Sequence, residues 1–340
     1  MSRPGSETKL ATTNRQRVLR LAWQALAPFV GLGVVVAIFL VYQVLERPDA
    51  PFLTSFRLTL IAKQTAIVGM GALGMTVVII AGGIDLSAGS LLALTSVTLA
   101  VALKAGTSPV LAVAIVLCVG LAAGALNGVL ITGLRLVPFI VTLGTMLVFR
   151  GLAEQISEQR KVSAAAPDWL GTLLDPPAAD SWQLVSTGVW LVIVLGLVLA
   201  AVMRYTVFGR HVFAIGSNEA TARLCGIHVP ATKIAVYAVG GLFGAVAGIL
   251  DFNDLNQQGS PTSGYSLELE MIAAVVIGGG SLTGGRGSVL GSIIGALTMT
   301  TLRSGCLYAG VSDPVQKIVI GGIIISAVAI DQWLHRGQGG

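Results

Sequence analysis

A polar stretch in the middle of the chain carries residues whose types and spacing suit a short capped helix. Ser217 or Asn218 can cap a short helix, because either side chain can accept from the free backbone N–H groups of the first turn. Glu219 then complements the dipole at the helix start, and Arg223 can pair with it four residues later. Gly226 is suited to end the helix. We expect a short, rigid, capped helix; an ordinary solvated amphipathic loop is the alternative.

A second group of polar residues interrupts strongly apolar sequence. Asp85 follows one apolar run, and either Asp85 or Ser87 can cap the next helix. The alternative is a gate or pathway role, because an ionisable group inside a membrane is costly and functional by default. Asn127, Thr142 and Thr145 could exchange hydrogen bonds with a neutral, hydroxyl-rich solute. Each threonine could equally bond to its own helix.

Two glycine-rich strings resemble nucleotide-binding motifs but lack essential parts of them. Residues 69–74 match G-x-G-x-x-G, yet they lie inside an apolar run and not between a strand and a helix. Residues 280–287 have the outline of a phosphate loop without its Lys-[Ser/Thr] pair. The three histidines have no ligand spacing, so no metal site is predicted. We expect no cofactor on this chain, and any ATP hydrolysis would be done elsewhere.

The composition of the chain indicates a membrane protein. Of the 340 residues 54% are hydrophobic and only 11% are charged, against roughly a quarter charged in soluble domains. Segments free of charged residues and long enough to cross a bilayer are 22–45, 64–84, 86–103, 105–134 and 181–203. Shorter runs are 136–149, 234–250, 271–285, 287–302 and 318–330. The fold class is therefore all-α, a polytopic membrane helix bundle of about ten spans. Arg150 is expected to reach the outer interface.

Charge predicts the topology. Residues 1–21 hold five basic residues against one acidic residue, which indicates a cytoplasmic tail. The membrane domain would cover 22–334, with an outer loop at 154–183 and a cytoplasmic loop at 204–233. Residues 335–340 would be a cytoplasmic C-terminal tail, because an even number of spans returns the chain inside. The outer loop is either simply solvated or a docking surface for a partner.

Glycines recur at four-residue intervals, which lets helix backbones approach closely where lipid provides no hydrophobic drive for association. Plain packing is the main interpretation, with gating motion as the alternative. The residues are Gly120, Gly124, Gly128, Gly240, Gly244, Gly248, Gly287, Gly291 and Gly295.

One short string occurs twice. Residues 78–89 read VIIAGGIDLSAG and residues 275–285 read VVIGGGSLTGG, so that with one gap Ser87 falls on Thr283. The two copies would run toward the cytoplasmic face in the same sense. Such parallel repeats build transporter folds with the pathway near the repeat interface. The match suggests an internal repeat.

Four blocks resemble the permease subunit of simple-sugar ABC importers of the ribose/xylose/arabinose type. They are GMTVVIIAGGIDLSAGSLLAL at 74–94, VPFIVTLGTMLVFRGLA at 137–153 after Asn127-Gly128, GRHVFAIGSNEATARLCGI at 209–227, and IAAVVIGGGSLTGGRGSVLGSIIGAL at 272–297. The blocks stand in the order expected for that family and cover most of the chain.

The resemblance implies a bacterial inner-membrane permease of about ten spans that dimerises with a second copy of itself. A periplasmic sugar-binding protein would deliver the sugar, and a cytoplasmic ABC ATPase would hydrolyse ATP. Membrane lipids surround the chain, and no nucleic acid partner is expected. The helix around Asn218 would be the coupling helix. Glu219-Ala220 is similar to the EAA-type motif of permeases, but the following glycine comes one residue late.

The resemblance leaves two other readings open. The same machinery could import a nucleoside or another small polyol-like solute. A stand-alone ion-coupled secondary transporter is a rival of a different class, and it would need buried carboxylates on its spans to carry the coupling ion. Asp85, which lies between two apolar runs at the expected membrane interface, is the one carboxylate that comes near this requirement.

Overall fold

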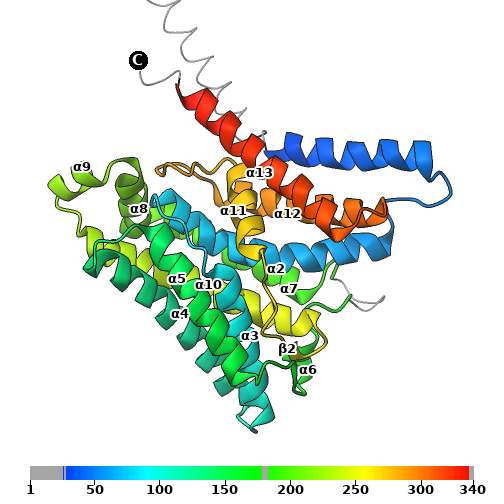
Figure 1. The fold of residues 1–340 in the computed structure, drawn as a ribbon, viewed down its shortest axis with the longest axis horizontal. Coiled ribbons are helices and arrows are strands. Elements are labelled where there is room, and N and C mark those ends of the chain that lie inside the picture. Colours follow the sequence, from blue (N-terminus) through cyan, green and yellow to red (C-terminus); the bar gives the residue numbers. More distant parts are fainter. Residues whose placement is uncertain (1–25, 27, 178–182, 337–340) are drawn as a thin grey trace, which may run out of the picture.

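The computed structural model describes residues 26, 28–177 and 183–336. The predicted tail 1–21, part of the predicted outer loop (178–182) and residues 337–340 lie outside the described residues. Helices make up nearly all of the regular structure (Figure 1). One two-stranded antiparallel ladder, which the sequence did not indicate, pairs β1 (Val162–Ser163) with β2 (Gln258–Gly259).

The helices follow in chain order. They are Pro28–Glu46, α2 (Ser55–Ile80), α3 (Ala88–Lys104), α4 (Pro109–Gly133), α5 (Pro138–Ile156), α6 (Asp168–Gly171), α7 (Thr187–Tyr205), α8 (Val207–Ser217), α9 (Glu219–Leu224), α10 (Val229–Asp254), α11 (Leu267–Ile277), α12 (Val289–Tyr308) and α13 (Asp313–Arg336).

The helices are long enough to form a multi-span bundle. Among the described residues, six helices are long and apolar enough to cross a membrane: Pro28–Glu46, α2, α4, α5, α7 and α10. The apolar helix α3 has 17 residues, α12 has 20 and α13 has 24. The predicted all-α multi-span class is therefore confirmed. In the predicted run 271–285 only residues 271–277, the last part of α11, are helical, because the glycines after Ile277 end the helix.

Capping residues and prolines predict where these helices begin better than hydropathy does. Proline occupies the first position of α4 and α5, where its missing N–H costs nothing. Helix α2 begins at Ser55, nine residues before the predicted run, because Thr54 caps it by accepting from the Arg57 N–H. The charged residues Arg57 and Lys63 lie within its first turns, and Arg57 stacks on the Tyr308 ring with 4.6 Å between the guanidinium carbon and the ring centre.

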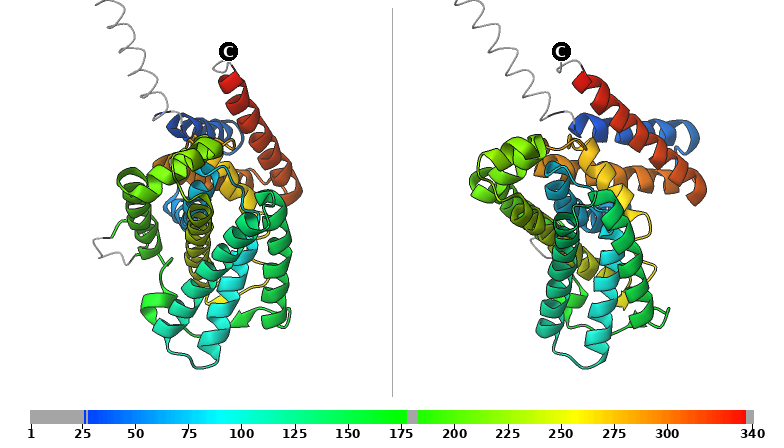
Figure 2. Two further views of the ribbon diagram at one scale, coloured as in Figure 1. Left: turned by 90° about the vertical axis from the view of Figure 1, so that its left-hand side faces the viewer. Right: turned by 60° about the vertical axis from the view of Figure 1, so that its left-hand side comes forward.

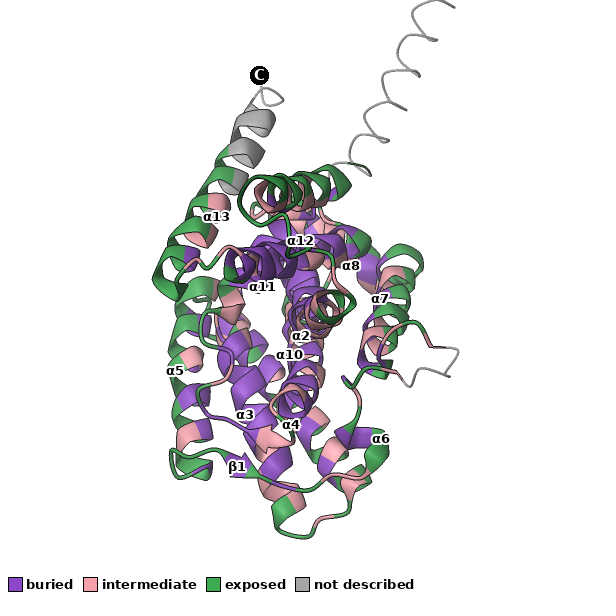
Figure 3. Ribbon diagram, turned by 90° about the vertical axis from the view of Figure 1, so that its right-hand side faces the viewer, coloured by how far each residue is buried: buried purple, intermediate pink, exposed green. Residues whose placement is uncertain are grey.

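Helix α10 lies at the centre and packs on α4, α2 and α3. Burial is deepest in α2, α3, α10 and α11, whereas α5, α7 and α13 are exposed along one side (Figure 3). Helices α2 and α12 run antiparallel, since Thr65 meets Thr300 (2.6 Å) and Thr76 donates to Ser292 (2.7 Å) between side-chain hydroxyls. The views in Figure 2 show α8 and α9 at the end of the bundle opposite the turn between α3 and α4.

All nine glycines at the four-residue spacing lie against neighbouring helices or loops. Gly120, Gly124 and Gly128 of α4 face α10, and a Cβ at Gly124 would overlap the carbonyl oxygen of Tyr237. The second trio faces α2 and α3; its members are Gly240, Gly244 and Gly248. The third trio, Gly287, Gly291 and Gly295, lies against Ile80 of α2, Gly278 and Ala274 of α11.

Close contact between α4 and α10 predicts a large difference between two glycine substitutions. Gly124→Ala should lower the free energy of unfolding by about 1–3 kcal/mol, because the added methyl group must separate two helix backbones. Gly144→Ala on α5 is the matched control, since a Cβ there meets nothing within 4 Å. Thermal unfolding of both variants in detergent measures the difference; equal midpoints would contradict the packing role.

Candidate functional site

Helix α9 forms a knob at one end of the bundle. It follows α8, whose N-cap Thr206 accepts from the Gly209 N–H, and it buries Ala222 against Ile215 and Val229. Its last residue, Leu224, has 89% of its surface exposed. An apolar side chain this exposed at the tip of a short helix is suited to insert into a partner.

The local geometry of α9 agrees with the predicted capped helix. The Asn218 side chain accepts from the Thr221 N–H at 2.9 Å, and the Arg223 guanidinium donates to Glu219 at 3.0 Å. Gly226 has φ +83°, the left-handed conformation that ends the helix, and its N–H donates to the Arg223 carbonyl. Ser217 is the last residue of α8, and Ala220 is exposed.

Lys233 of α10 is part of this site although the sequence did not single it out. Its ammonium donates to the Glu219 carboxylate at 2.7 Å, and its side chain is only 19% exposed. The hydrogen bond from Lys233 is the main reason that the pKa of Glu219 lies below its usual range, and Arg223 adds to the effect. Glu219 therefore ties α9 to α10.

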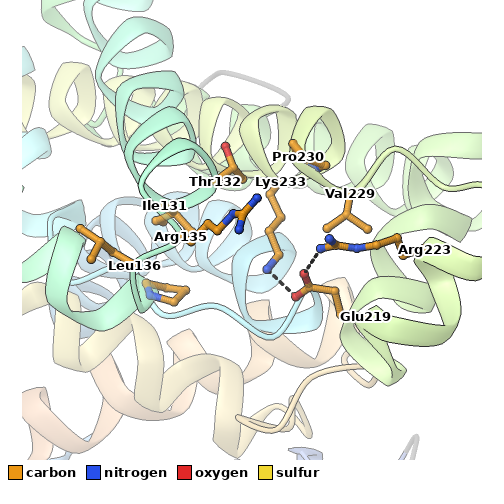
Figure 4. Close-up of a pocket in the computed structure, with 10 residues that line it drawn as sticks. Ile131, Thr132, Arg135, Leu136, Glu219, Arg223, Val229, Pro230 and Lys233 are labelled. Carbon is orange, nitrogen blue, oxygen red and sulfur yellow. Dashed lines mark hydrogen bonds and ion pairs between the residues drawn. The ribbon is translucent and has the colours of Figure 1, made fainter.

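A pocket of about 510 Å³ opens between the start of α10 and the turn from α4 to α5. Figure 4 shows Lys233 and Arg223 both directed at Glu219 across it, with Arg135 on the α4 side. The pocket walls thus carry three cationic side chains and one carboxylate. Because the pocket adjoins α9, any movement of α9 against α10 changes its shape.

The end of α8 is wedged between two loops that lie far apart in sequence. These are residues 81–87, after α2, and residues 278–288, after α11. A Cβ at Gly216 would overlap the carbonyl oxygen of Ile80 and lie 2.5 Å from the Gly285 nitrogen. Gly285 itself donates to that Ile80 carbonyl at 2.8 Å. The two loops and the residue that precedes α9 by three positions are therefore in direct backbone contact.

The two loops have the same hydrogen-bond pattern. Gly82 and Gly83 donate to carbonyls of α2 as Gly279 and Gly280 do to carbonyls of α11, and Gly82 and Gly279 both have positive φ. After these caps, the Ser87 hydroxyl donates to the Asp85 carboxylate at 2.6 Å. The side chains of Ser281 and Thr283 lie at the aligned positions and are bonded at 2.9 Å.

The predicted pathway residues lie around loop 81–87 and are all buried. Asp85 accepts from both the N–H and the hydroxyl of Ser87, and Asn127 of α4 donates to the Ser87 hydroxyl at 2.9 Å. Thr142 of α5 donates to the Ile84 carbonyl at 3.2 Å. The structure thus brings four of the five together. Thr145 does not join them, and its hydroxyl lies against the Thr142 carbonyl of its own helix.

The turn between α2 and α3 is held from several sides at once. Ser87 is the N-cap residue of α3, but its side chain makes no capping bond, because its hydroxyl is engaged with Asp85 and Asn127. The side-chain amide oxygen of Asn127 has no hydrogen-bond partner among the described residues. This network joins loop 81–87 to α4 and α5. It lies one or two helix turns from the pocket that adjoins α9.

The expectation that Arg150 reaches the outer interface is wrong. Arg150 is 8% exposed and donates to the carbonyl oxygens of Pro261 (2.5 Å) and Ser263 (2.6 Å). It turns inward because the extended chain before α11 offers carbonyl groups that no helix satisfies. The signal was the polar stretch before α11, which interrupts the apolar sequence.

The predicted outer loop is fastened to the other end of α10. The Asn253 side chain donates to the Leu170 carbonyl at 2.9 Å and accepts from the Leu174 N–H at 2.8 Å. The Gln257 side chain accepts from the Ala166 N–H at 2.8 Å. Within the described ranges no three His, Cys, Asp or Glu side chains are grouped to hold a metal ion.

Protonation of Glu219 is expected to free α9 from α10. The pKa of Glu219 is lowered, so the contribution of its ion pairs is complete at neutral pH. That contribution is lost as the pH falls through the lowered pKa, below the ordinary value of about 4.3. A spin label on the exposed Cys225, with Cys118→Ser to remove the other exposed thiol, should become more mobile over that range. Lys233→Met is the control and should give a mobile label already at pH 7; an identical pH profile in both proteins would contradict the assignment.

Comparison with known proteins gives the site its family context. Residues 57–328 match the family model described as the permease component of the branched-chain amino acid transport system. No solved structure gives a significant match.

Curated relatives cover almost the whole chain. The ribose import permease protein of Bacillus subtilis (strain 168) is 38% identical over 91% of this chain and 93% of its own length. The fructose import permease protein of Rhizobium meliloti is 36% identical over 84% of this chain and 80% of its own. The xylose transport system permease protein of Escherichia coli (strain K12) is 34% identical over 97% and 98%. The chain therefore belongs to this family of multi-pass membrane permease components, as its four sequence blocks indicated.

Proposed function

We propose that this chain is the membrane permease subunit of a bacterial ATP-driven monosaccharide importer. The observation that carries the proposal is its similarity, over almost its full length, to permeases named for ribose, fructose and xylose, which are all monosaccharides. The chain forms the pathway, and a separate cytoplasmic ABC ATPase binds ATP and Mg²⁺. A nucleoside or another small polyol is the alternative cargo of the same machinery.

Ten helices cross or enter the membrane in the proposed arrangement. They are Pro28–Glu46, α2, α3, α4, α5, α7, α10, α11, α12 and α13. With α9 in the cytoplasm, alternation of direction places both chain termini on the cytoplasmic side and the segment between α5 and α7 outside. The antiparallel pairing of α2 with α12 and the matching caps of α2 and α11 support this order and an internal repeat.

Helix α9 is the proposed coupling helix. Exposed Ala220, Arg223 and Leu224 would enter a groove on the ATPase. Displacement of α9 would act through the end of α8 on loops 81–87 and 278–288, because Gly216 touches both. Loop 81–87 is bonded to α4 and α5 through Asn127 and Thr142, so its movement would open or close the pathway at the inner side.

The remaining partners are assigned by position. A periplasmic sugar-binding protein would dock on the outer segment that Asn253 and Gln257 fasten to α10. A second copy of the chain would complete the transporter within the lipid of the inner membrane. The exposed apolar faces of α5, α7 and α13 provide the surface for lipid and for that second copy.

Reconstitution tests the proposal directly. The chain, its ATPase and its binding protein are placed in liposomes with ATP supplied to the ATPase side, and uptake of radiolabelled ribose, xylose and fructose is measured. We expect uptake of at least one of these sugars that needs all three proteins and ATP. Uphill uptake by the chain alone, driven by a proton or sodium gradient without ATP, would contradict it.

Gly216→Ala is expected to uncouple the ATPase from transport. The added methyl group would push the end of α8 away from Ile80, which costs about 1–3 kcal/mol of packing at the contact between α8 and both loops. Sugar uptake should fall about tenfold or more while ATP hydrolysis by the assembled complex persists. The control is Gly133→Ala at the end of α4, where a Cβ meets nothing within 4 Å. Equal uptake per ATP in the two variants would show that Gly216 does not transmit the movement.

A further inference from the structure

Residues 259–266, between α10 and α11, run as non-helical chain deep alongside α3. Gly259 lies against α3 with 2.7 Å from its Cβ position to the Ser96 carbonyl oxygen, and Gly264 lies against Gly89. Gly89 is fifteen residues from the end of α3 at Lys104, which is about 22 Å along a helix. The segment therefore extends well past the middle of a hydrocarbon core of about 30 Å.

One side of this segment is open. Thr262, Tyr265 and Ser266 are exposed, and Tyr265 retains 63% of its accessible surface. Ser266 is held in the left-handed conformation, with φ 65°, just before α11 begins. Non-helical backbone at membrane depth is tolerated only where protein buries it or where it lines water, because lipid cannot hydrogen-bond to it. Lipid is thereby excluded as the environment of this face.

The other side of the segment is firmly held. Arg150 is buried and bonds to the carbonyls of Pro261 and Ser263. Asp251 of α10 accepts from the hydroxyls of Ser96 (3.0 Å) and Ser263. The Arg150 guanidinium also lies 4.3 Å from the centre of the Tyr265 ring. An aromatic ring backed on one face by a cation is fixed in orientation and keeps its other face free.

We propose that residues 261–266 line the water-filled sugar pathway and that the free face of Tyr265 is a contact surface for the passing monosaccharide. The inference rests on the proposed function and deepens it. A sugar is a neutral solute with apolar C–H faces and a rim of hydroxyl groups. The Tyr265 ring offers an apolar face, and Thr262 and Ser266 are exposed on the same open segment. The Thr262 hydroxyl is bonded to that of Ser260 at 3.0 Å and can still accept a hydrogen bond from a solute.

The other polar groups of the membrane region have different surroundings. Asn127, Thr142 and the carboxylate of Asp85 are buried in the network around loop 81–87, with no exposed face to meet a solute. The pocket beside α9 is lined by charged side chains and lies at the bundle end. Segment 261–266 combines depth, exposure and hydroxyl groups. Arg150 is the positioning residue, because it acts on the sugar only through the ring and the two carbonyls it holds.

Thiol labelling in the assembled transporter tests whether the segment meets water. In a Cys118→Ser, Cys225→Ser background, single cysteines replace Thr262 or Tyr265 and are treated with a membrane-impermeant, charged thiosulfonate. We expect rapid labelling of both, slowed severalfold by saturating transported sugar. Leu197→Cys on the exposed face of α7 is the lipid-facing control and should stay unlabelled.

Transport measurements test the contact. Tyr265→Ala should reduce sugar uptake about tenfold with a raised half-saturating sugar concentration, and Tyr265→Phe should recover most of that loss. Arg150→Lys keeps the charge but not the two-carbonyl geometry, so the proposed role predicts a smaller loss in the same parameter. ATP hydrolysis by the complex shows whether each variant is assembled.

The outcomes separate this inference from the proposed function. If the unmodified complex moves no monosaccharide, the proposed function fails. If it transports while cysteines at 262 and 265 stay unlabelled, or while Tyr265→Ala is as active as Leu197→Ala, the inference is overturned. If the cysteines stay unlabelled in a transporting complex, the second copy covers the segment.

Discussion

Every backbone N–H and C=O group inside a bilayer needs a partner, and the rest of this structure depends on how that requirement is met. Long helices meet it internally. Among the described residues, the chain leaves helical conformation within the packed bundle at the loops 81–87 and 278–288 and at the segment 259–266. The first two are capped on their own helices and joined by a bond from Gly285 to Ile80. The third is covered on one side by Arg150 and Asp251 and is open on the other. Where backbone groups must find their hydrogen-bond partners outside the chain, we expect a functional site.

Glycine allows the non-helical loops 81–87 and 278–288 to pack closely against α8. At Gly216 the backbone of α8 lies directly against the carbonyl of Ile80. No side chain between them could change its conformation when α8 is displaced. Backbone contact of this kind transmits displacement more directly than flexible side chains do, since packed interiors are dense and barely compressible. The same close approach holds α4 to α10 through Gly120, Gly124 and Gly128. Helices α4 and α10 are therefore held together as one packed unit, and α9 is joined to it through the bond from Lys233 to Glu219.

Local features were predictable from sequence because their causes are local. The Asn218 cap, the Glu219–Arg223 pair and the stop at Gly226 each span only a few residues, and the structure contains all three. Lys233 was missed because it reaches Glu219 from fourteen residues away, across a turn that no periodicity reveals. Arg150 was placed wrongly because hydropathy treats a charge near a helix end as seeking water, whereas here unsatisfied carbonyls lie closer. The match between the two GG loops was visible in sequence, but their contact with Gly216 depends on the whole fold.

The polar groups of the membrane region thus divide into two kinds with different physical roles. Around loop 81–87, the Ser87 hydroxyl is bonded to both Asp85 and Asn127. A solute could take the place of one partner only by disturbing the bonds to the other as well. Such a network resists passage and is suited to a closed gate. Along 261–266 the inward bonds are made by Arg150 and Asp251. On the open side the Thr262 hydroxyl is bonded to that of Ser260, so a solute would exchange one hydroxyl bond there and not a network. The proposed pathway needs both: a surface that a sugar can enter and leave easily, and a network that would open when α9 is displaced.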